Sequence, residues 1–541
     1  MLFVKRTWLD IALLIIFVVL GGCLKLIYPT DLLWDLLNYH YYNPWALVHD
    51  RLGYDIAPAT LNTFFNPLLD LPFYFMIRLW NDIPSLIRFL QGTSYGLLIF
   101  VFYKIATLFF DIKKQKLAFF LTILIATTGF SVLSQVGIVS NEIQIAVLIL
   151  WGFYIILKAI DNDKRAGTVW VFSGLLMGCA LGLKPTSISY CVAIGGTLII
   201  FHKLLHISMK EIVIFAICGV LGYLIVNGWW MWKLYSHFDN PFFPFLNKIF
   251  KSEYFDAVNY YDIRFLKGPW WHRLIFPFFM TFNYGQYYTA ETFYIDFRYL
   301  FVYGAVIWGI ITWLLDKHVW PPRKFLLLYA FVGLSYLVWL NVFAIIRYAV
   351  VVEMLSIIIL VHFFETRYPR CYWKQLVFIS GMIVGVYVLL SEVFNYMKGW
   401  DKVWYGKHYI EIEKIAVPED ALIKIYGFPS ALVAARIVDD RPNRIVAYAS
   451  YNYGTYIDFM DRGKLQEKRD LIEKHHQGTE IILAVREWDF HDELISKVQQ
   501  KGMYCRLLHF PWDKVDICVP EKLKYQILLE EERYGNKKSA E

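Results

Sequence analysis

Long apolar runs recur along this chain, and each is about as long as the hydrocarbon core of a bilayer is thick. They occupy residues 8–28, 85–110, 117–136, 142–160, 168–184, 188–203, 212–232, 296–315, 323–342, 346–363 and 374–391. Hydrophobic residues fill 58% of the 541 positions and charged residues only 18%, which excludes an ordinary soluble domain. The runs predict a mainly α-helical, polytopic membrane protein with about eleven transmembrane helices.

Basic residues gather in the short loops between these runs and predict the orientation of the chain. By the positive-inside rule, such loops face the cytoplasm. About eleven crossings place all of them there, together with the N-terminus: residues 5–6, 113–116, 164–165, 202–210, 317–324 and 367–374. The loops 29–84 and 233–295 and the C-terminal tail are then expected outside the cytoplasm. We expect a multi-pass protein of an inner bacterial membrane.

One apolar segment, residues 66–78, does not fit the pattern of a span. It is short, and it carries Asp70 and two prolines. Counting it as a crossing would move the basic loop 113–116 outside the cytoplasm. We therefore expect a helix that lies along the outer surface or re-enters the membrane.

Past residue 392 charged residues become frequent and the apolar runs shorten. Short strands are predicted at 421–426, 444–447, 480–485 and 515–519, and helices at 465–475 and 489–500. This pattern predicts a transmembrane domain over 1–391 and a small extracytoplasmic α/β domain over 392–541. Cys505 and Cys518 lie in two apolar runs that predict a hairpin, which would place the thiols opposite each other for a disulfide. The alternative is two buried free cysteines.

An acidic, aromatic segment follows the first apolar run. Asp31 and Asp35 are four residues apart, so a helix would put both on one face. Asn38, Tyr39 and Tyr42 continue that face and become candidate substrate-binding residues. Charges beside the bilayer are costly and usually functional, so we predict a general base here. The alternatives are a helix cap or solvated loop charge for the acids, and an interfacial belt for the aromatics.

Further charged residues lie where apolar runs begin or end. Glu142 opens a run and is a second catalytic candidate, although it could simply complement the helix dipole. Candidate cations for a phosphate are Arg347, beside Tyr348, together with Lys184 and Arg298. Arg347 falls on the expected outer side, against the positive-inside bias. Lys184 could instead extend to the interface, and Arg298 could pair with Asp296 or Glu291.

Taken in order, these motifs resemble the GT-C superfamily of membrane glycosyltransferases, which includes protein O-mannosyltransferases and the lipid A aminoarabinose transferase. The resemblance rests on Asp31 and Asp35, Glu142, Lys184-Pro185, the Trp229 to Pro244 segment with its Asn240-Pro241, and Arg347-Tyr348. Many members place adjacent acids in the first motif, whereas here they are four apart, so either aspartate could be the base. The resemblance implies inverting transfer of a sugar from a polyprenyl-phosphate donor to an extracytoplasmic lipid, glycan or protein.

Other classes remain open at this point. A secondary transporter or flippase, or a non-catalytic envelope assembly protein, would also be polytopic. The net charge of +7 lies in loops and does not suggest a nucleic-acid partner. We find no CxxC or Cys/His cluster and expect neither a metal site nor a cofactor. The alternative is a divalent cation on the acidic residues, which a likeness to oligosaccharyltransferases would imply.

Overall fold

The computed structural model describes residues 2–28, 33–163, 166–257, 265, 268–282, 289, 294–315, 321–367, 406–412, 415–448, 463–508 and 514–524. The chain divides into two compact units. The first comprises Met1–Tyr28, Arg88–Gly228 and Tyr261–Gly399, and the second comprises Pro29–Ile87, Trp229–Tyr260 and Trp400–Glu541. This division differs from the expected boundary at 391/392. The expected outer loop 29–84 and the first part of the loop 233–295, up to residue 260, belong to the same unit as the C-terminal domain.

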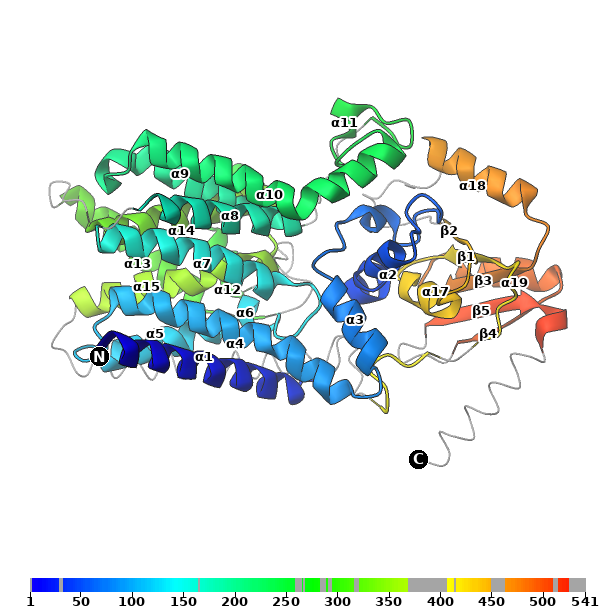
Figure 1. The fold of residues 1–541 in the computed structure, drawn as a ribbon, viewed down its shortest axis with the longest axis horizontal. Coiled ribbons are helices and arrows are strands. Elements are labelled where there is room, and N and C mark those ends of the chain that lie inside the picture. The colour runs from blue at the N-terminus through cyan, green and yellow to red at the C-terminus, as the bar shows by residue number, and fades with distance from the viewer. Residues whose placement is uncertain are drawn as a thin grey trace. The chain divides into compact units, whose positions relative to one another are not determined.

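Within the described residues, 8 helices are long and apolar enough to cross a membrane. They are α1 (Leu2–Leu26), α4 (Pro84–Phe109), α7 (Glu142–Asp161), α9 (Ile188–Leu205, extended by η3, Pro185–Ser187), α10 (Met209–Phe238), α13 (Arg298–Leu315), α14 (Arg323–Val342) and α15 (Val350–Arg367, preceded by η5, Ile346–Ala349) (Figure 1). The predicted multi-pass architecture is confirmed by these helices. The expected span 374–391 lies outside the described residues.

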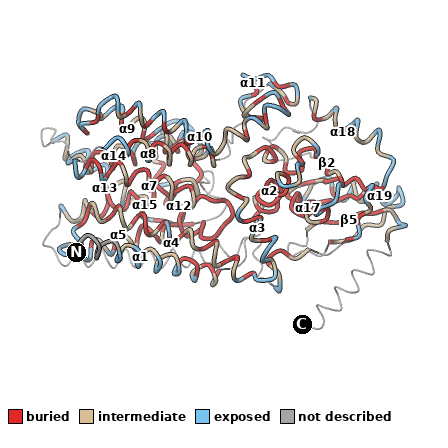
Figure 2. The backbone as a smooth tube through the Cα atoms, in the orientation of Figure 1, coloured by how far each residue is buried: buried red, intermediate tan, exposed pale blue. Residues whose placement is uncertain are grey.

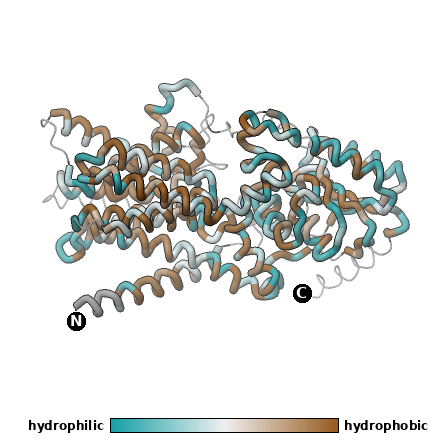
Figure 3. Tube along the Cα trace, turned by 45° about the horizontal axis from the view of Figure 1, so that its top comes forward, coloured by the Kyte–Doolittle hydropathy of each residue, from teal (hydrophilic) through white to brown (hydrophobic). Residues whose placement is uncertain are grey.

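The long helices differ in how far they are buried. α7 and α15 are mostly buried among their neighbours, whereas most residues of α1 and α10 are partly or fully exposed (Figure 2). The exposed side chains of α1 and α10 are nevertheless largely apolar. Figure 3 shows this for α1, the mostly brown helix that starts at the N-terminus. An apolar surface of this kind is what lipid chains require of a helix that contacts them.

Two expected spans form shorter helices. The run 168–184 becomes α8 (Gly167–Leu183), and the run 117–136 becomes α5 (Lys116–Thr127) followed by the short α6 (Phe130–Leu133). The expectation of one continuous helix over 117–136 is wrong. The chain is extended at Gly129, where a Cβ atom would lie 1.3 Å from a carboxylate oxygen of Glu353. Glu353 therefore occupies the place that a continuous helix with an ordinary side chain would need.

Glycine allows α8 and α10 to approach closely. A Cβ atom on Gly178 would lie 1.9 Å from the carbonyl oxygen of Gly219. Small residues permit such close packing of membrane helices, where apolar burial alone does not drive association. Elsewhere in this unit α7 packs on α8, α9 on α14, and α15 on both α5 and α13.

The second unit contains the predicted small α/β domain. Its sheet has the order β2-β1-β3-β5-β4, formed by β1 (Leu422–Tyr426), β2 (Ile445–Tyr448), β3 (Glu480–Val485), β4 (Met503–Leu507) and β5 (Val515–Pro520). β1 runs parallel to β2 and β3, whereas β5 is antiparallel to β3 and β4. The helices are α17 (Ala431–Val438), α18 (Gly463–His475) and α19 (His491–Gln500). Of these, α17 was not predicted.

The predicted disulfide is confirmed by the structure. Cys505 and Cys518 face each other across β4 and β5, with their Cα atoms 4.0 Å apart, and they are bonded. Cys518 belongs to a buried cluster with Ile482 of β3 and Val498 of α19, so the bond fastens the antiparallel edge of the sheet to its helix.

Segments from the expected outer loops complete this unit. Ile56 forms a parallel bridge with Val446 at the open edge of β2, through the bonds Ile56 N to Ile445 O (3.0 Å) and Ala447 N to Ile56 O (3.1 Å). Covering an edge in this way leaves fewer backbone groups free for another chain. The π-helical turn η1 (Leu36–His40) and α2 (Tyr42–Val48) pack against α17.

The remaining elements are short. The expected surface helix 66–78 appears as α3 (Leu71–Trp80), whose 10 residues are too few to cross a bilayer. The others are η2 (Thr60–Phe64), α11 (Asn247–Phe250), η4 (Trp270–Arg273), α12 (Phe276–Phe282) and η6 (Glu521–Leu523).

Candidate functional site

In the first unit, three chain turns bring predicted site residues together. Glu142 opens α7 after Asn141, which adopts a left-handed conformation that asparagine tolerates. Lys184 follows α8 in an extended conformation, as expected before Pro185. The Lys184 ammonium forms an ion pair with the Glu142 carboxylate and also donates to the Ser140 carbonyl. Both side chains are largely buried, with 16% and 5% of their surfaces exposed.

The third turn, η5, adds Arg347 and Tyr348. The Arg347 guanidinium lies 5.3 Å from the centre of the Tyr348 ring, and the Lys184 ammonium lies 5.7 Å from the same ring. Tyr190 of α9 donates its hydroxyl to the Tyr348 carbonyl and so fixes the turn. Glu142, Lys184, Arg347 and Tyr348, which were predicted separately, therefore form one cluster.

A pocket opens beside this cluster. Its space, including the open mouth, is about 230 Å³. Glu142, Arg347 and Tyr348 line it together with the hydroxyl groups of Thr186, Ser187 and Tyr190, and the rest of the lining is aliphatic. The cluster thus brings two cations, Lys184 and Arg347, together with the Glu142 carboxylate. Such a surface suits an anionic group that is attached to an apolar body, because charge-assisted bonds and apolar contacts lie side by side.

Arg298 belongs to a different, buried network. Its guanidinium pairs with Asp296 (Nε to Oδ1, 2.8 Å) and donates to the Ile125 carbonyl (2.9 Å). The expected alternative, internal pairing with Asp296, is thus confirmed. The role of Arg298 in binding phosphate stays a prediction, although these bonds already use both ends of its guanidinium.

Glu353 lies in this region and was not predicted as a site residue. It is 2% exposed, it accepts the hydroxyl of Tyr299, and it accepts the Ser131 amide at 3.1 Å. The sequence could have marked Glu353 as a candidate, because it is a carboxylate inside the apolar run 346–363. Ionisable residues within membrane helices are costly and usually functional.

In the second unit, Asp35 lies half-buried immediately before η1, whereas Asp31 lies outside the described residues. The π-helical turn changes the spacing of the side chains, so the expected continuous α-helical face from Asp35 to Tyr42 is not formed. Single π-turns inside helices occur frequently at functional sites. The assignment of Asp35 and Asp31 as general bases stays a prediction.

The neighbours of Asp35 bond within the unit. Asn38 donates to the Ala59 carbonyl (3.3 Å), and the Tyr39 ring meets Phe65 edge-on. The Tyr42 hydroxyl donates to Asp55 (2.9 Å). Burial, reinforced by the Asp55 carboxylate, holds the pKa of Tyr42 well above its ordinary value, so this hydroxyl remains a neutral donor. These bonds give Asn38 and Tyr42 structural roles, and their contact with a substrate stays a prediction.

In the described part of the chain, no group of 3 or more His, Cys, Asp or Glu residues is arranged to hold a metal ion. In comparisons with known proteins, no protein-family model matches the chain. No curated protein sequence matches it significantly either.

Proposed function

We propose that this protein is an integral-membrane glycosyltransferase that transfers a sugar from a polyprenyl-phosphate donor to an extracytoplasmic acceptor. The observation that carries the proposal is the cluster of Glu142, Lys184, Arg347 and Tyr348 beside a partly apolar pocket. A lipid phosphate has the matching chemistry, namely an anionic head on an apolar chain.

The reaction needs few groups from the protein. The acceptor oxygen bonds to C1 of the sugar as the bond from C1 to the phosphate oxygen breaks. The acceptor hydroxyl proton passes to a carboxylate, for which Asp35 and Asp31 are the candidates. The lipid phosphate leaves with the bonding electrons, and Arg347 and Lys184 would stabilise its charge. A single displacement of this kind inverts the anomeric centre.

The test measures transfer from a radiolabelled polyprenyl-phosphate sugar by the full chain in liposomes. Asp35→Asn or Asp31→Asn should lower the rate by about 10²–10⁴-fold, since that is what loss of a positioned base costs. Asp82→Asn, which changes an exposed carboxylate of the same outer segment, is the matched control. Near-full activity in both aspartate variants would remove the proposed bases. In parallel, Arg347→Ala should weaken binding of a polyprenyl phosphate, while Arg323→Ala, at an exposed ion pair, should not.

A second candidate function is favoured by the buried network around Glu353. Secondary transporters use carboxylates inside membrane helices to carry protons or ions. Glu353 of α15 is such a carboxylate: it accepts the Tyr299 hydroxyl, and the nearby ion pair of Arg298 and Asp296 acts on it electrostatically. Sugar or lipid flux in proteoliposomes that is abolished by Glu353→Gln, without any glycosyl transfer, would favour the transporter.

A further inference from the structure

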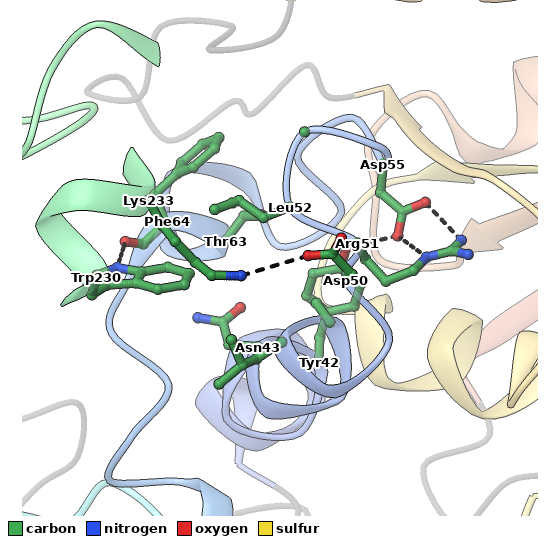
Figure 4. Close-up of a pocket in the computed structure, with 13 residues that line it drawn as sticks. Tyr42, Asn43, Asp50, Arg51, Leu52, Asp55, Thr63, Phe64, Trp230 and Lys233 are labelled. Carbon is green, nitrogen blue, oxygen red and sulfur yellow. Dashed lines mark hydrogen bonds and ion pairs between the residues drawn. The ribbon is translucent and has the colours of Figure 1, made fainter. Parts of the chain in front are cut away.

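A patch of large apolar side chains lies exposed on η4 and α12, in the part of the expected outer loop 233–295 that belongs to the first unit. Each residue of this patch is between 44% and 73% exposed, and the set comprises Trp270, Trp271, Leu274 and Phe278. Trp230, which lines the small pocket of Figure 4, shows ordinary packing instead: it is 5% exposed, and its indole nitrogen donates to the Phe64 carbonyl (3.0 Å). A contiguous exposed apolar patch marks a contact with another protein or with a membrane.

The segment that carries the patch is fixed on its inner side. Phe276 of α12 is buried, and α12 packs on α13. The Tyr303 hydroxyl in the second turn of α13 donates to the Leu274 carbonyl (2.6 Å). The Arg273 guanidinium donates to Asn341 Oδ1 in the last turn of α14 (2.6 Å). The patch is therefore held at the ends of α13 and α14 that the predicted orientation places outside the cytoplasm.

The patch continues into a helix surface that suits lipid chains. Only 11% of the apolar stretch of α13 is buried, and its exposed residues include Phe301, Trp308 and Leu315. Phe278 of the patch meets the Tyr303 ring of this helix edge-on, with the ring centres 6.2 Å apart. α12 itself has 7 residues, which are too few to cross a bilayer. Short elements that are rich in tryptophan and apolar on their outer face are typical of the interface between membrane and water.

The charges of the segment favour lipid over a second copy of this chain. The stretch 268–282 contains Arg273 and no carboxylate. A symmetric contact between two copies would bring the two arginines together without counter-charges, and burying unpaired charges is costly. In the lipid interface, the same exposed guanidinium can donate to lipid phosphates. We infer that η4 and α12 lie in the extracytoplasmic lipid interface, with the patch inserted between the headgroups and the first part of the acyl chains.

The inner side of this interfacial segment is connected to the turn that carries Arg347. The Phe276 ring lies 6.0 Å from the ring of Trp339 in α14. The Trp339 indole nitrogen donates to the carbonyl of Ile345 (2.8 Å), the residue directly before η5. Resting on the proposed function, this connection holds Arg347 near the depth of lipid phosphates, where the phosphate of a polyprenyl donor lies. The interfacial position of the patch does not itself depend on that function.

The test places a fluorescent coumarin amino acid at position 270 of the full chain in phosphatidylcholine nanodiscs. Coumarin is excited at wavelengths that the 20 tryptophans of the chain do not absorb, so only the probe is read. Lipids brominated near the glycerol should quench it more than lipids brominated at the chain ends, because interfacial helices insert their apolar face by only about 5–10 Å. The control carries the probe at Leu471, an exposed position of the polar helix α18. Aqueous iodide should quench the probe at position 270 several-fold less than at this control position.

Three results would overturn the inference. Iodide quenching at position 270 equal to that of the control would place the patch in water, and stronger quenching from the chain ends would place it deep in the bilayer. Quenching by neither agent would mean that protein covers the patch, as in a dimer of this chain. If the probe at position 270 prevents folding, Leu274, which is 60% exposed, takes the same probe. The proposed function fails independently, because shallow lipid quenching in a chain without any transfer activity would keep the interfacial segment and refute the enzyme.

Discussion

The buried ion pair of Asp55 and Arg51 allows a sharp prediction about stability. Asp55 accepts Arg51 through two bonds (2.8 and 3.0 Å), and it also accepts the Tyr42 hydroxyl (2.9 Å) and the Ile445 amide (2.9 Å). The two charged side chains, of Arg51 and Asp55, are only 6% and 1% exposed. Asp55→Asn keeps the shape but leaves a buried guanidinium without its counter-charge. Breaking such a pair costs about 3–5 kcal/mol, or roughly 10²–10⁴-fold in the population of the open state.

Hydrogen exchange measured by mass spectrometry on the full chain in detergent reports this change locally. Peptides that contain β2 should lose protection by that factor, because the Ile445 amide donates directly to Asp55. Asp440→Asn is the matched control. Its side chain is 63% exposed, and exposed pairs contribute only about 0–1 kcal/mol.

A second substitution separates the charge effect from the loss of hydrogen bonds. Arg51→Met removes the guanidinium, so Asp55→Asn should cost less in that background than alone, by about 0.5–3 kcal/mol. The introduced asparagine side chain would still accept the Ile445 amide through its carbonyl oxygen. Unchanged exchange at β2 in Asp55→Asn, or simple addition of the two effects in the double variant, would refute this account of the pair.

Three further predictions follow from the fold. Replacing Cys505 and Cys518 by serine should destabilise the sheet by about 3 kcal/mol, measured as faster hydrogen exchange in β4 and β5. Mass spectrometry of non-reduced peptides from native membranes should find the disulfide, and two free thiols would contradict it. Gly178→Val should lower the yield of folded protein, because the valine side chain would meet the α10 backbone. Gly167→Ala is the control and should leave the yield unchanged, because position 167 faces open space. Equal yields of the two variants would refute close packing of α8 and α10. Alkaline phosphatase fused to the C-terminal domain should be active and green fluorescent protein dark, and the reverse would overturn the proposed orientation.

Apolar run length predicted the long helices well, because a membrane helix satisfies its own backbone and needs little from its neighbours. The exception is the break at Gly129, which depends on Glu353. The Glu353 carboxylate also accepts the amide of Ser131, from which it is separated by 222 residues along the chain. No local pattern contains that contact. The pairing of Arg298 with Asp296, only two residues apart, could by contrast be predicted as an alternative.

The candidate site was predictable by residue type but not by arrangement. Glu142 and Arg347 were marked by their position at the start of an apolar run, and Lys184 by its position at the end of one. Their assembly into one cluster depends on turns that lie far apart in the sequence, so only the structure could supply it. The predicted helical face runs from Asp31 to Tyr42, and its described part from Asp35 onward is not formed. The local pattern was helical, but the turn that packs on α17 is a π-turn.

The bridge between Ile56 and Val446 has a consequence for biogenesis. Ile56 covers the β2 strand, and the neighbouring Asp55 accepts the amide of Ile445 in that strand. Ile445 is synthesised 390 residues after Asp55. At about 5–20 residues per second, the ribosome needs roughly 20–80 s to make that length. During this time the segment that contains Asp55 and Ile56 has left the ribosome without its strand, and the apolar helices between are still being inserted. The edge contact at Ile56 and the bond from Ile445 to Asp55 can therefore form only after the intervening apolar helices have been synthesised.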